Sequence, residues 1–392
     1  MKLAVPKETK PKENRVALTP AAVKGLSAQG FTCAIEKGAG EASYFSDAEF
    51  AAAGAGIVEN TAELYGGADV IVKVNAPGTS EIALMKPGAV LISFMFAQTN
   101  PMLVKACINR GVSSFSMDAI PRISRAQKMD ALSSQSNLAG YKAVMLAANK
   151  LGKIFPMLMT AAGTVKPSKV VVMGAGVAGL QAIATAKRLG AIVEVSDIRP
   201  ETKEQVESLG GKFIESEADG SIKIEGGYVK DVSEAFLKKQ QETVAKHVMS
   251  ADIVITTALV TGKKAPLLVT EDMLQGMRAG SVVVDMAVEQ GGNCFGSELD
   301  ETVVKYGVSI IGESNLPSLV PLNASDLYAR NISAFLAHLT TPSEFKWDLE
   351  EEITKGSLII YKGKLLHKGL ISSVYPHDQS TLNLNEDHSW NI

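Results

Sequence analysis

The alternation of short apolar strands with helical segments constrains the fold of this 392-residue chain more than any other feature. In its first third, β-branched and apolar runs predict strands at 3–5, 32–35, 70–74, 89–93 and 112–115. Segments of helical period lie between these runs, for example at 21–29 and 101–109. Continuous apolar strands separated by helices are typical of parallel sheets covered by helices on both faces. The pattern therefore predicts an α/β fold.

The same pattern returns after residue 169, which indicates a second α/β domain. Its expected strands and helices lie at 170–173, 178–189, 192–195, 253–256, 282–285, 308–310 and 324–339. Parallel strands joined through helices again predict a covered sheet.

A polar stretch at 118–136 separates the two series, and a long Ala- and Met-rich helix is expected at 137–159, kinked near Gly152 and Pro156. The segment after about residue 320 has too little apolar material for a core of its own. We therefore expect it to return to the first domain. We predict two Rossmann-like domains with a cleft between them: 1–133 together with 320–392, and 134–319.

Charge and composition exclude several classes of protein. Lys and Arg number 39 against 42 Asp and Glu, a net charge of -3, which leaves no excess of positive charge to hold a nucleic acid. Cys33, Cys107 and Cys294 are scattered without a CxxC pair, so we expect buried free thiols and no metal site. No apolar run approaches the roughly 18 residues of a transmembrane helix. The charged N-terminus lacks the features of a secretory signal. We expect a polypeptide that does not itself span a membrane.

A glycine-rich motif follows the expected strand 170–173 and opens the helix after it. Gly174, Gly176 and Gly179 have the GxGxxG spacing, in the strand–turn–helix context that gives this motif its meaning. The first glycine allows a tight turn, the second lets a pyrophosphate approach the backbone, and the third lets helix and strand pack closely. The helix N-terminus offers N–H groups to the phosphates. The spacing predicts a dinucleotide-binding site in the second domain.

Asp197 ends the next expected strand, where a carboxylate can accept hydrogen bonds from the ribose hydroxyl groups. Its charge would repel a 2′-phosphate, which favours NAD(H) over NADP(H). Arg199 leaves the alternative open, because an arginine can accept that phosphate.

The distribution of histidines bears on the reaction. The five histidines all lie in the last 146 residues, at His247, His338, His367, His377 and His388. Dehydrogenases of hydroxy or amino acids need a proton acceptor beside the hydride donor, often a histidine. Hydride transfer between two nicotinamides needs none, because no oxygen or nitrogen atom changes its protonation. The pattern favours such a transfer, although Lys, Tyr or Asp could replace the imidazole. We interpret His247 as a surface group and the last three histidines as solvated.

The polar stretch 121–141, with the sequence PRISRAQKMDALSSQSNLAGY, is long and specific. It resembles the signature loop of domain I, the NAD(H)-binding component of proton-translocating nicotinamide nucleotide transhydrogenases. The resemblance extends over nearly the whole chain. It includes VPKE at 5–8, NRVALTP at 14–20, MLMTAAGT at 157–164, KEQVES at 203–208, TTAL at 256–259 and GGNC at 291–294. The divided bacterial form, in which domain I is a separate subunit, is the most similar.

The resemblance implies an NAD(P)+ transhydrogenase of the proton-translocating, Si/Re-specific class. Hydride would pass directly between NAD(H) on this chain and NADP(H) on a separate domain III subunit, without a metal. Transmembrane domain II subunits would couple this transfer to proton translocation. The resemblance also implies a homodimer, cytoplasmic and held at the cytoplasmic face of the inner membrane through its partners.

The family's site residues carry over onto matching positions. Arg122, Gln127 and Asp130 would hold the nicotinamide and its ribose, and Ser133 would bind the carboxamide. Fixing the carboxamide fixes the ring rotation, and so the C4 hydrogen that faces outward. The alternative is that Arg122 and Asp130 form an ion pair of purely structural importance.

Further cofactor contacts in the family match Val177, Asp197, Ile198, Arg199, Gly227, Gln240 and Leu259. The stretch 225–230 resembles the family's mobile loop, in which Tyr228 would close over bound nucleotide. The alternative for this stretch is a surface insertion without a role in binding.

Alanine dehydrogenase, which shares the expected architecture, is the main competing interpretation. Arg15 and Lys73 match positions that hold its substrate, but no histidine stands near 94–96, where its catalytic histidine would fall. Glu289 stands near its catalytic aspartate. Arg15 and Lys73 are then interpreted as structural residues in ion pairs. A third possibility is a non-catalytic NAD-sensing module.

Overall fold

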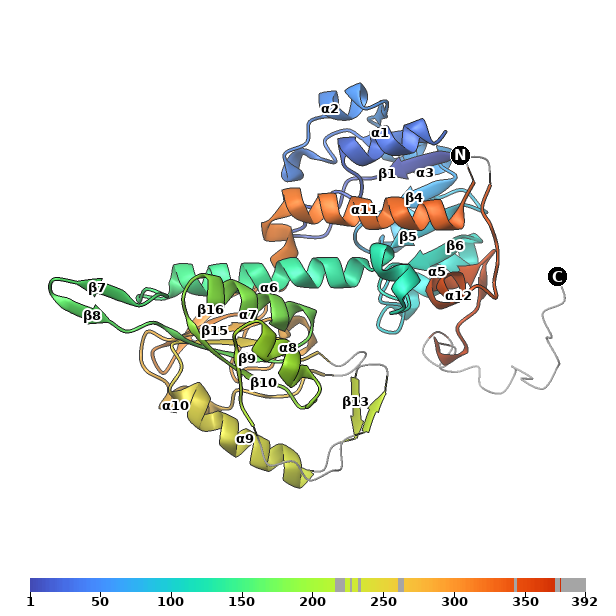
Figure 1. Ribbon diagram of the computed structural model, residues 1–392. Coiled ribbons are helices and arrows are strands. Elements are labelled where there is room, and N and C mark those ends of the chain that lie inside the picture. The colour runs from blue at the N-terminus through green and yellow to red at the C-terminus, as the bar shows by residue number, and fades with distance from the viewer. Residues whose placement is uncertain are drawn as a thin grey trace. The chain divides into compact units, whose positions relative to one another are not determined.

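The computed structural model describes residues 1–215, 223–225, 228–231, 234–259, 264–341, 344–370 and 374. The chain divides into two compact units, of which the first comprises Met1–Ser134 and Pro321–Ile392 and the second Gln135–Val320. In both units a largely parallel sheet is flanked by helices, so the predicted α/β fold with two Rossmann-like domains is confirmed (Figure 1).

The sheet of the first unit has the strand order β19-β18-β6-β5-β4-β1-β2-β3. Its strands are β1 (Lys2–Val5), β2 (Thr32–Glu36), β3 (Gly56–Val58), β4 (Val70–Val72), β5 (Val90–Ser93), β6 (Ser113–Ser116), β18 (Leu358–Tyr361) and β19 (Lys364–Leu365). β1 to β6 pair in parallel, whereas β18 runs antiparallel to β6 and to β19. The C-terminal segment of the chain therefore extends the sheet of the first unit.

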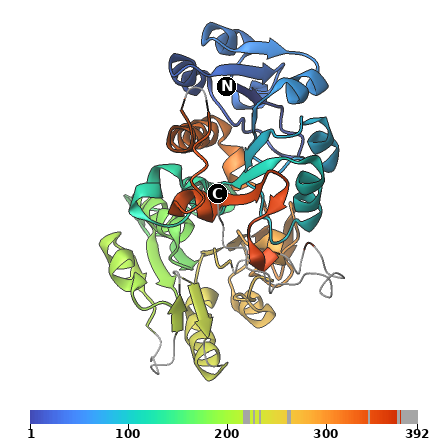
Figure 2. The same ribbon diagram turned by 90° about the vertical axis from the view of Figure 1, so that its right-hand side faces the viewer.

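Helices cover both faces of this sheet (Figure 2). They are α1 (Pro20–Ala28), α2 (Asp47–Ala52), α3 (Thr61–Gly67), α4 (Thr79–Leu84), α5 (Pro101–Arg110), α11 (Pro321–Leu339) and α12 (Glu352–Ser357), with the short helices η1 (Glu41–Ser43), η2 (Ser124–Met129) and η5 (Lys368–Leu370). Successive residues of β1 enter opposite cores, Leu3 and Val5 on one face and Ala4 on the other. This burial on both faces explains why the strands are continuous apolar runs in the sequence.

The second unit has the sheet order β11-β10-β9-β14-β15-β17-β16, with only β16 antiparallel among these described strands. Its strands are β9 (Lys169–Met173), β10 (Ile192–Ser196), β11 (Lys212–Phe213), β14 (Ile253–Thr256), β15 (Val282–Asp285), β16 (Thr302–Lys305) and β17 (Val308–Ile311). Its helices are α7 (Val177–Arg188), α8 (Thr202–Ser208), α9 (Glu234–Met249), α10 (Glu271–Gly276), η3 (Val288–Gln290) and η4 (Leu316–Leu319). A separate pair is formed by β12 (Lys223–Glu225) and β13 (Tyr228–Asp231).

The long helix expected at 137–159 is wrong at both ends. The helix α6 spans Ala131–Lys150. It begins early because Asp130 accepts a hydrogen bond from the N–H of Ser133 at 2.8 Å, as a helix N-cap does. It ends before Pro156, a residue that disfavours helical conformation in itself and in its predecessor.

A two-stranded hairpin replaces the end of the expected helix. It pairs β7 (Leu158–Thr160) with β8 (Gly163–Val165) and extends away from the sheet of its own unit (Figure 1). All six strand residues are exposed, including Met159 at 74%. The hairpin thus presents apolar side chains to solvent.

All three cysteines are buried free thiols, as expected. Among the described residues, no helix combines the length and the hydrophobicity that crossing a membrane would require. The C-terminal segment after Val374 lies outside the described residues, together with His377 and His388.

Candidate functional site

The glycine-rich turn lies at the carboxyl end of β9. Gly174 has a φ of +107°, and its N–H donates to the carbonyl of Ser196 at 2.8 Å. A Cβ atom on Gly174 would lie 2.4 Å from the Thr257 hydroxyl oxygen. Both the backbone conformation and the close approach of a neighbouring segment therefore require glycine here.

The other two glycines of the motif differ in their surroundings. A Cβ on Gly179 would lie 1.8 Å from the carbonyl oxygen of Gly174, so the helix packs on the turn without room for a side chain. Gly176, the N-cap of α7, faces open space instead. Among the described residues no side chain caps α7, and Val177 in its first turn is 40% exposed. The helix N-terminus is therefore accessible to an anion.

Asp197 joins the end of β10 to this turn. Its Oδ2 accepts a hydrogen bond from the N–H of Ala175 at 2.6 Å. The Arg199 side chain also binds this carboxylate, with Nε–Oδ1 and Nη2–Oδ2 distances of 3.0 and 2.8 Å. Ile198 lies between them and is partly buried. The acidic and basic groups that the sequence placed at the ribose position thus form an ion pair.

The order of the strands also points to the carboxyl end of β9 as a binding site. β10 lies on one side of β9 and β14 lies on the other, so successive connections diverge from β9 in opposite directions. In open α/β sheets, ligands bind beyond the carboxyl ends of strands at such a reversal. Thr257, Ala258 and Leu259 follow β14 at this edge, and Leu259 is 47% exposed.

The polar stretch of the first unit forms η2 and the first turn of α6. The side chains of Arg122 and Gln127 are exposed. Asp130 and Ser133 lie together, because the Ser133 hydroxyl donates to Asp130 Oδ2 at 2.6 Å. Asp130 therefore has a structural function as a helix cap in addition to any binding function.

Asn331 of α11 supports this segment and was not singled out by the sequence. Its Nδ2 atom donates to the carbonyl of Lys128 at 2.9 Å, and its Oδ1 accepts from the Ser134 hydroxyl at 2.7 Å. The two partners flank Asp130 in the chain. The sequence indicates this role of Asn331 only by placing a polar residue on the apolar face of the helix α11.

Three predicted contacts lie wholly or partly outside the described residues. Gly227 lies outside the described residues, and so does Gly226 beside it in the stretch 225–230. Tyr228 begins β13, and Gln240 lies in α9, but the described structure gives only their backbone positions.

Arg15 and Lys73 take part in buried ion pairs of the first unit. Arg15 binds Glu13, with an Nη2–Oε2 distance of 2.6 Å, and Lys73 Nζ lies 2.9 Å from Glu81 Oε1 and 3.7 Å from Glu8 Oε2. Burial raises the pKa of Glu8, an effect that the nearby Lys73 ammonium only partly offsets. The two cations are thus already neutralised by carboxylates of the same unit.

The segment after β5 has no acid–base group at the position expected for a dehydrogenase histidine. Phe94 is buried, and Phe96 is 50% exposed with a φ of +44°, a rare conformation for a bulky residue. Asp118 Oδ1 holds this backbone by accepting from the N–H groups of Met95 and Phe96 at 2.8 and 3.1 Å. Glu289 lies in the short helix η3 of the second unit and is exposed.

Two of the histidine interpretations need refinement. His247 is partly exposed and its Nδ1 lies 2.6 Å from Glu194 Oε2, so it is a paired surface group. His367 is partly buried, and the interpretation that it is solvated is wrong. Burial lowers its pKa, because a charged imidazolium is disfavoured away from water.

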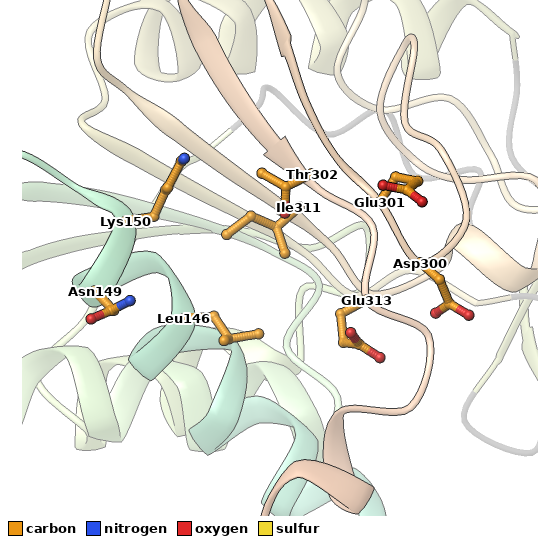
Figure 3. A pocket seen from close by; sticks show the side chains of 8 residues that line it. All are labelled: Leu146, Asn149, Lys150, Asp300, Glu301, Thr302, Ile311 and Glu313. Carbon is orange, nitrogen blue, oxygen red and sulfur yellow. The ribbon is translucent and has the colours of Figure 1, made fainter. Parts of the chain in front are cut away.

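A hollow of about 200 Å³ lies elsewhere in the second unit, beside the C-terminal end of α6 and the outer strand β16 (Figure 3). It is lined by Leu146, Asn149, Lys150, Asp300, Glu301, Thr302, Ile311 and Glu313. Its three carboxylates do not suit the phosphates of a nucleotide. Among the described residues, no group of three or more His, Cys, Asp or Glu side chains is arranged to hold a metal ion.

Comparisons with known proteins agree over almost the whole chain. Residues 4–139 match the N-terminal domain of the alanine dehydrogenase/PNT family, and residues 143–368 match its C-terminal domain. The first piece of the divided NAD(P) transhydrogenase subunit alpha of Rhodospirillum rubrum is 50% identical over 379 residues, which cover 94% of this chain and 99% of that protein. Alanine dehydrogenase 2 of Staphylococcus aureus is 31% identical over 380 residues, covering 94% of this chain and 95% of that protein.

Solved structures give the same result. A transhydrogenase from Sinorhizobium meliloti superposes with a TM-score of 0.82 at 42% identity, covering 94% of this chain and all of that one. An L-alanine dehydrogenase superposes with a TM-score of 0.79 at 27% identity, covering 96% and 99%. The chain therefore belongs to the alanine dehydrogenase/PNT family and is a homologue of the α subunit of NAD(P) transhydrogenase.

Proposed function

We propose that this chain is the NAD(H)-binding component of a proton-translocating transhydrogenase. It holds NAD(H) so that hydride passes directly between its nicotinamide and that of NADP(H) on a separate domain III subunit. Transmembrane domain II subunits couple this transfer to proton movement. The chain itself works at the cytoplasmic face of the membrane through these partners.

The observation that carries this proposal is the open N-terminus of α7 at the strand reversal. The turn from Gly174 to Gly179 leaves the backbone at Gly176 uncovered, beside the carboxylate of Asp197. Pyrophosphate binds at the helix N-terminus, and the adenosine ribose binds near Asp197. For this to occur, Arg199 shifts from Asp197 towards solvent or binds the ribose together with it. Leu259, Gln240, Gly227 and Tyr228 complete the nucleotide contacts.

Arg122, Gln127 and Asp130 hold the nicotinamide and its ribose, and Ser133 binds the carboxamide. The Asp130–Ser133 hydrogen bond supports this assignment, because it orients both groups before a ligand arrives. These residues contribute to catalysis by positioning the nicotinamide ring for hydride transfer. The two C4 atoms must approach to about 3–3.5 Å, and the exclusion of water protects the hydride.

Several features favour transfer between nucleotides over amino-acid chemistry. The segment 94–96 has no side chain that could accept a proton, and Arg15 and Lys73 are engaged by Glu13, Glu8 and Glu81. A small carboxylate substrate would have to displace these internal partners. The reaction proposed here needs neither a proton acceptor nor a carboxylate-binding cation.

The exposed hairpin supports the homodimer that the family resemblance implies. An isolated two-stranded hairpin is at best marginally stable in water. Here it carries Leu158 and Met159, exposed at 48% and 74%, and Met157 directly before it is 59% exposed. Contact with a second copy of the chain would bury these side chains.

The test is to mix the purified chain with an NADP(H)-binding domain III subunit and to follow reduction of an NAD analogue by NADPH. We expect rapid transfer only when both proteins are present. A second reaction, with the chain alone, pyruvate, ammonia and NADH, should give no turnover. Turnover there would establish an alanine dehydrogenase, and NADH binding without turnover in either reaction would establish a sensing module.

A further inference from the structure

One buried asparagine of the second unit joins both sides of the loop that follows β14. Asn293 Nδ2 donates to the carbonyl oxygens of Ala258 at 3.0 Å and Pro266 at 2.8 Å. Its Oδ1 accepts from the N–H of Ala258 at 3.1 Å. The residue is 0% exposed, so water cannot replace any of these bonds. Both amide hydrogens and the amide oxygen of Asn293 therefore make hydrogen bonds.

A buried carboxylate fixes the position of this asparagine. Asp285, at the end of β15, accepts from the N–H groups of Asn293 at 2.9 Å and Cys294 at 3.0 Å. Gly292 has a φ of +80°, and a Cβ there would lie 2.7 Å from Asp285 Oδ2. The chain can therefore wrap this closely around the carboxylate only with glycine at position 292.

The segment that Asn293 holds packs directly against the glycine-rich turn. Thr257 precedes Ala258, and its hydroxyl lies 3.2 Å from the carbonyl oxygens of both Met173 and Gly174. A displacement of Ala258 would move Thr257 and thereby the wall of the strand reversal at which nucleotides bind. Hydrogen bonds thus connect Asp285 to Asn293, Asn293 to Ala258, and Thr257, the chain neighbour of Ala258, to Gly174.

We propose that Asn293 is a positioning residue for NAD(H) binding, which holds Thr257–Leu259 in place beside the phosphate-binding turn. This proposal rests on the proposed function. The buried site presents two carbonyl oxygens and one N–H group to the side chain at position 293. A primary amide satisfies all three, because it donates two hydrogen bonds and accepts one. An ionised aspartate of the same shape can only accept, and would face two carbonyl oxygens.

The decisive variant is Asn293→Asp, studied by equilibrium binding of NADH. At about pH 8 we expect the Kd to rise roughly tenfold or more, because two buried carbonyls lose their donor. Burial and the adjacent carbonyls favour the protonated form of the new carboxyl group, which can donate one hydrogen bond. Lowering the pH to about 6 should therefore restore part of the affinity relative to wild type.

Asn149→Asp is the matched control, since Asn149 is an exposed asparagine of α6 in the same unit. It should leave the Kd unchanged at both pH values. Circular dichroism establishes that each variant is folded at the temperature of the binding measurement. A pH-reversible change in Kd in a folded protein is not expected of a residue that contributes only to stability.

If Asn293→Asp does not fold, Thr257→Val tests whether the segment that Asn293 holds is needed for NADH binding. It removes the link to Met173 and Gly174, and should also raise the Kd for NADH. Wild-type affinity in folded Asn293→Asp at both pH values, or in Thr257→Val, would overturn the role of Asn293. Failure of the wild-type chain to bind NADH would instead overturn the proposed function.

Discussion

Glu13 binds the guanidinium group of Arg15 inside the first unit through two side-chain hydrogen bonds, of 2.8 and 2.6 Å. Burial alone would raise the pKa of Glu13, but the hydrogen bonds and positive charge of Arg15, together with a hydrogen bond from Asn75, outweigh this effect and hold the pKa at about 2. A carboxyl group whose pKa is lower in the folded state stabilises the fold above its ordinary pKa. This stability is lost as the pH falls towards the folded value.

We predict that Glu13→Gln destabilises the first unit at neutral pH. The shift from 4.5 to about 2 corresponds to roughly 3 kcal/mol, at about 1.4 kcal/mol for each pKa unit. The difference from wild type should be constant above about pH 5 and should shrink as the pH falls further. Urea unfolding followed by tryptophan fluorescence measures the effect, because Trp347 stacks on Phe115 and Phe345 of this unit.

Glu63→Gln is the control for this experiment, because Glu63 is an exposed carboxylate of the same unit. It should change the free energy of unfolding by no more than a few tenths of a kcal/mol. An equal effect of both substitutions would show that the Glu13–Arg15 pair contributes no specific stability.

Gly179→Ala should abolish NADH binding. The new methyl group would lie 1.8 Å from the carbonyl oxygen of Gly174, which is backbone and cannot rotate away. The turn must therefore open, and the N–H groups at the start of α7 lose their arrangement. Isothermal titration with NADH measures the loss. Gly152→Ala is the control, because a Cβ atom at this position has no other atom within 4 Å, and this variant should bind NADH normally. Normal NADH binding by Gly179→Ala would contradict the assigned site.

Arg122→Ala should slow transhydrogenation with domain III by at least tenfold while changing the Kd for NADH less. An interaction that positions the ring for transfer affects the rate more than the ground-state affinity. Stopped-flow reduction of an NAD analogue by NADPH measures the rate. Arg125→Ala is the control from the same segment, since Arg125 is 63% exposed and pairs with Glu351 and Glu352. Equal rates in wild type and Arg122→Ala would remove Arg122 from the mechanism.

Replacing Leu158 and Met159 together by serine should weaken the proposed homodimer. Burial of apolar surface drives most subunit association, and these two side chains lie on the exposed hairpin. Sedimentation velocity across a dilution series should show at least a tenfold increase in the dimer dissociation constant. Met102→Ser removes a side chain of α5 that is 77% exposed and should have no such effect. A dimer of unchanged affinity would exclude the hairpin from the interface.

The sequence predicted the parallel strands well because both faces of each strand are buried. β14 and β15 have the predicted bounds, since their apolar runs end where the chain leaves the core. The glycine motif was also predictable, because backbone conformation and close packing restrict Gly174 and Gly179 to glycine regardless of the rest of the fold. Local sequence was sufficient in these places.

Errors arose where particular hydrogen bonds, and not the pattern of apolar residues, decide the local conformation. The apolar residues Met157–Met159 are compatible with a helix, and only the pairing of Leu158 with Val165 makes them a strand. The early start of α6 depends on a cap by Asp130 within a polar stretch. The support of the site by Asn293 and Asn331 could not be predicted, because their partners lie 27 or more residues away in the sequence, up to 203.

The three buried cysteines have a practical consequence. Burial raises the pKa of Cys33 to about 11 and those of Cys107 and Cys294 to about 12. Only a minute fraction of each thiol is ionised at neutral pH, and maleimide dyes and spin labels react with the thiolate. A single cysteine introduced on the exposed hairpin would thus be labelled selectively in the otherwise native protein, giving a spectroscopic reporter of subunit assembly.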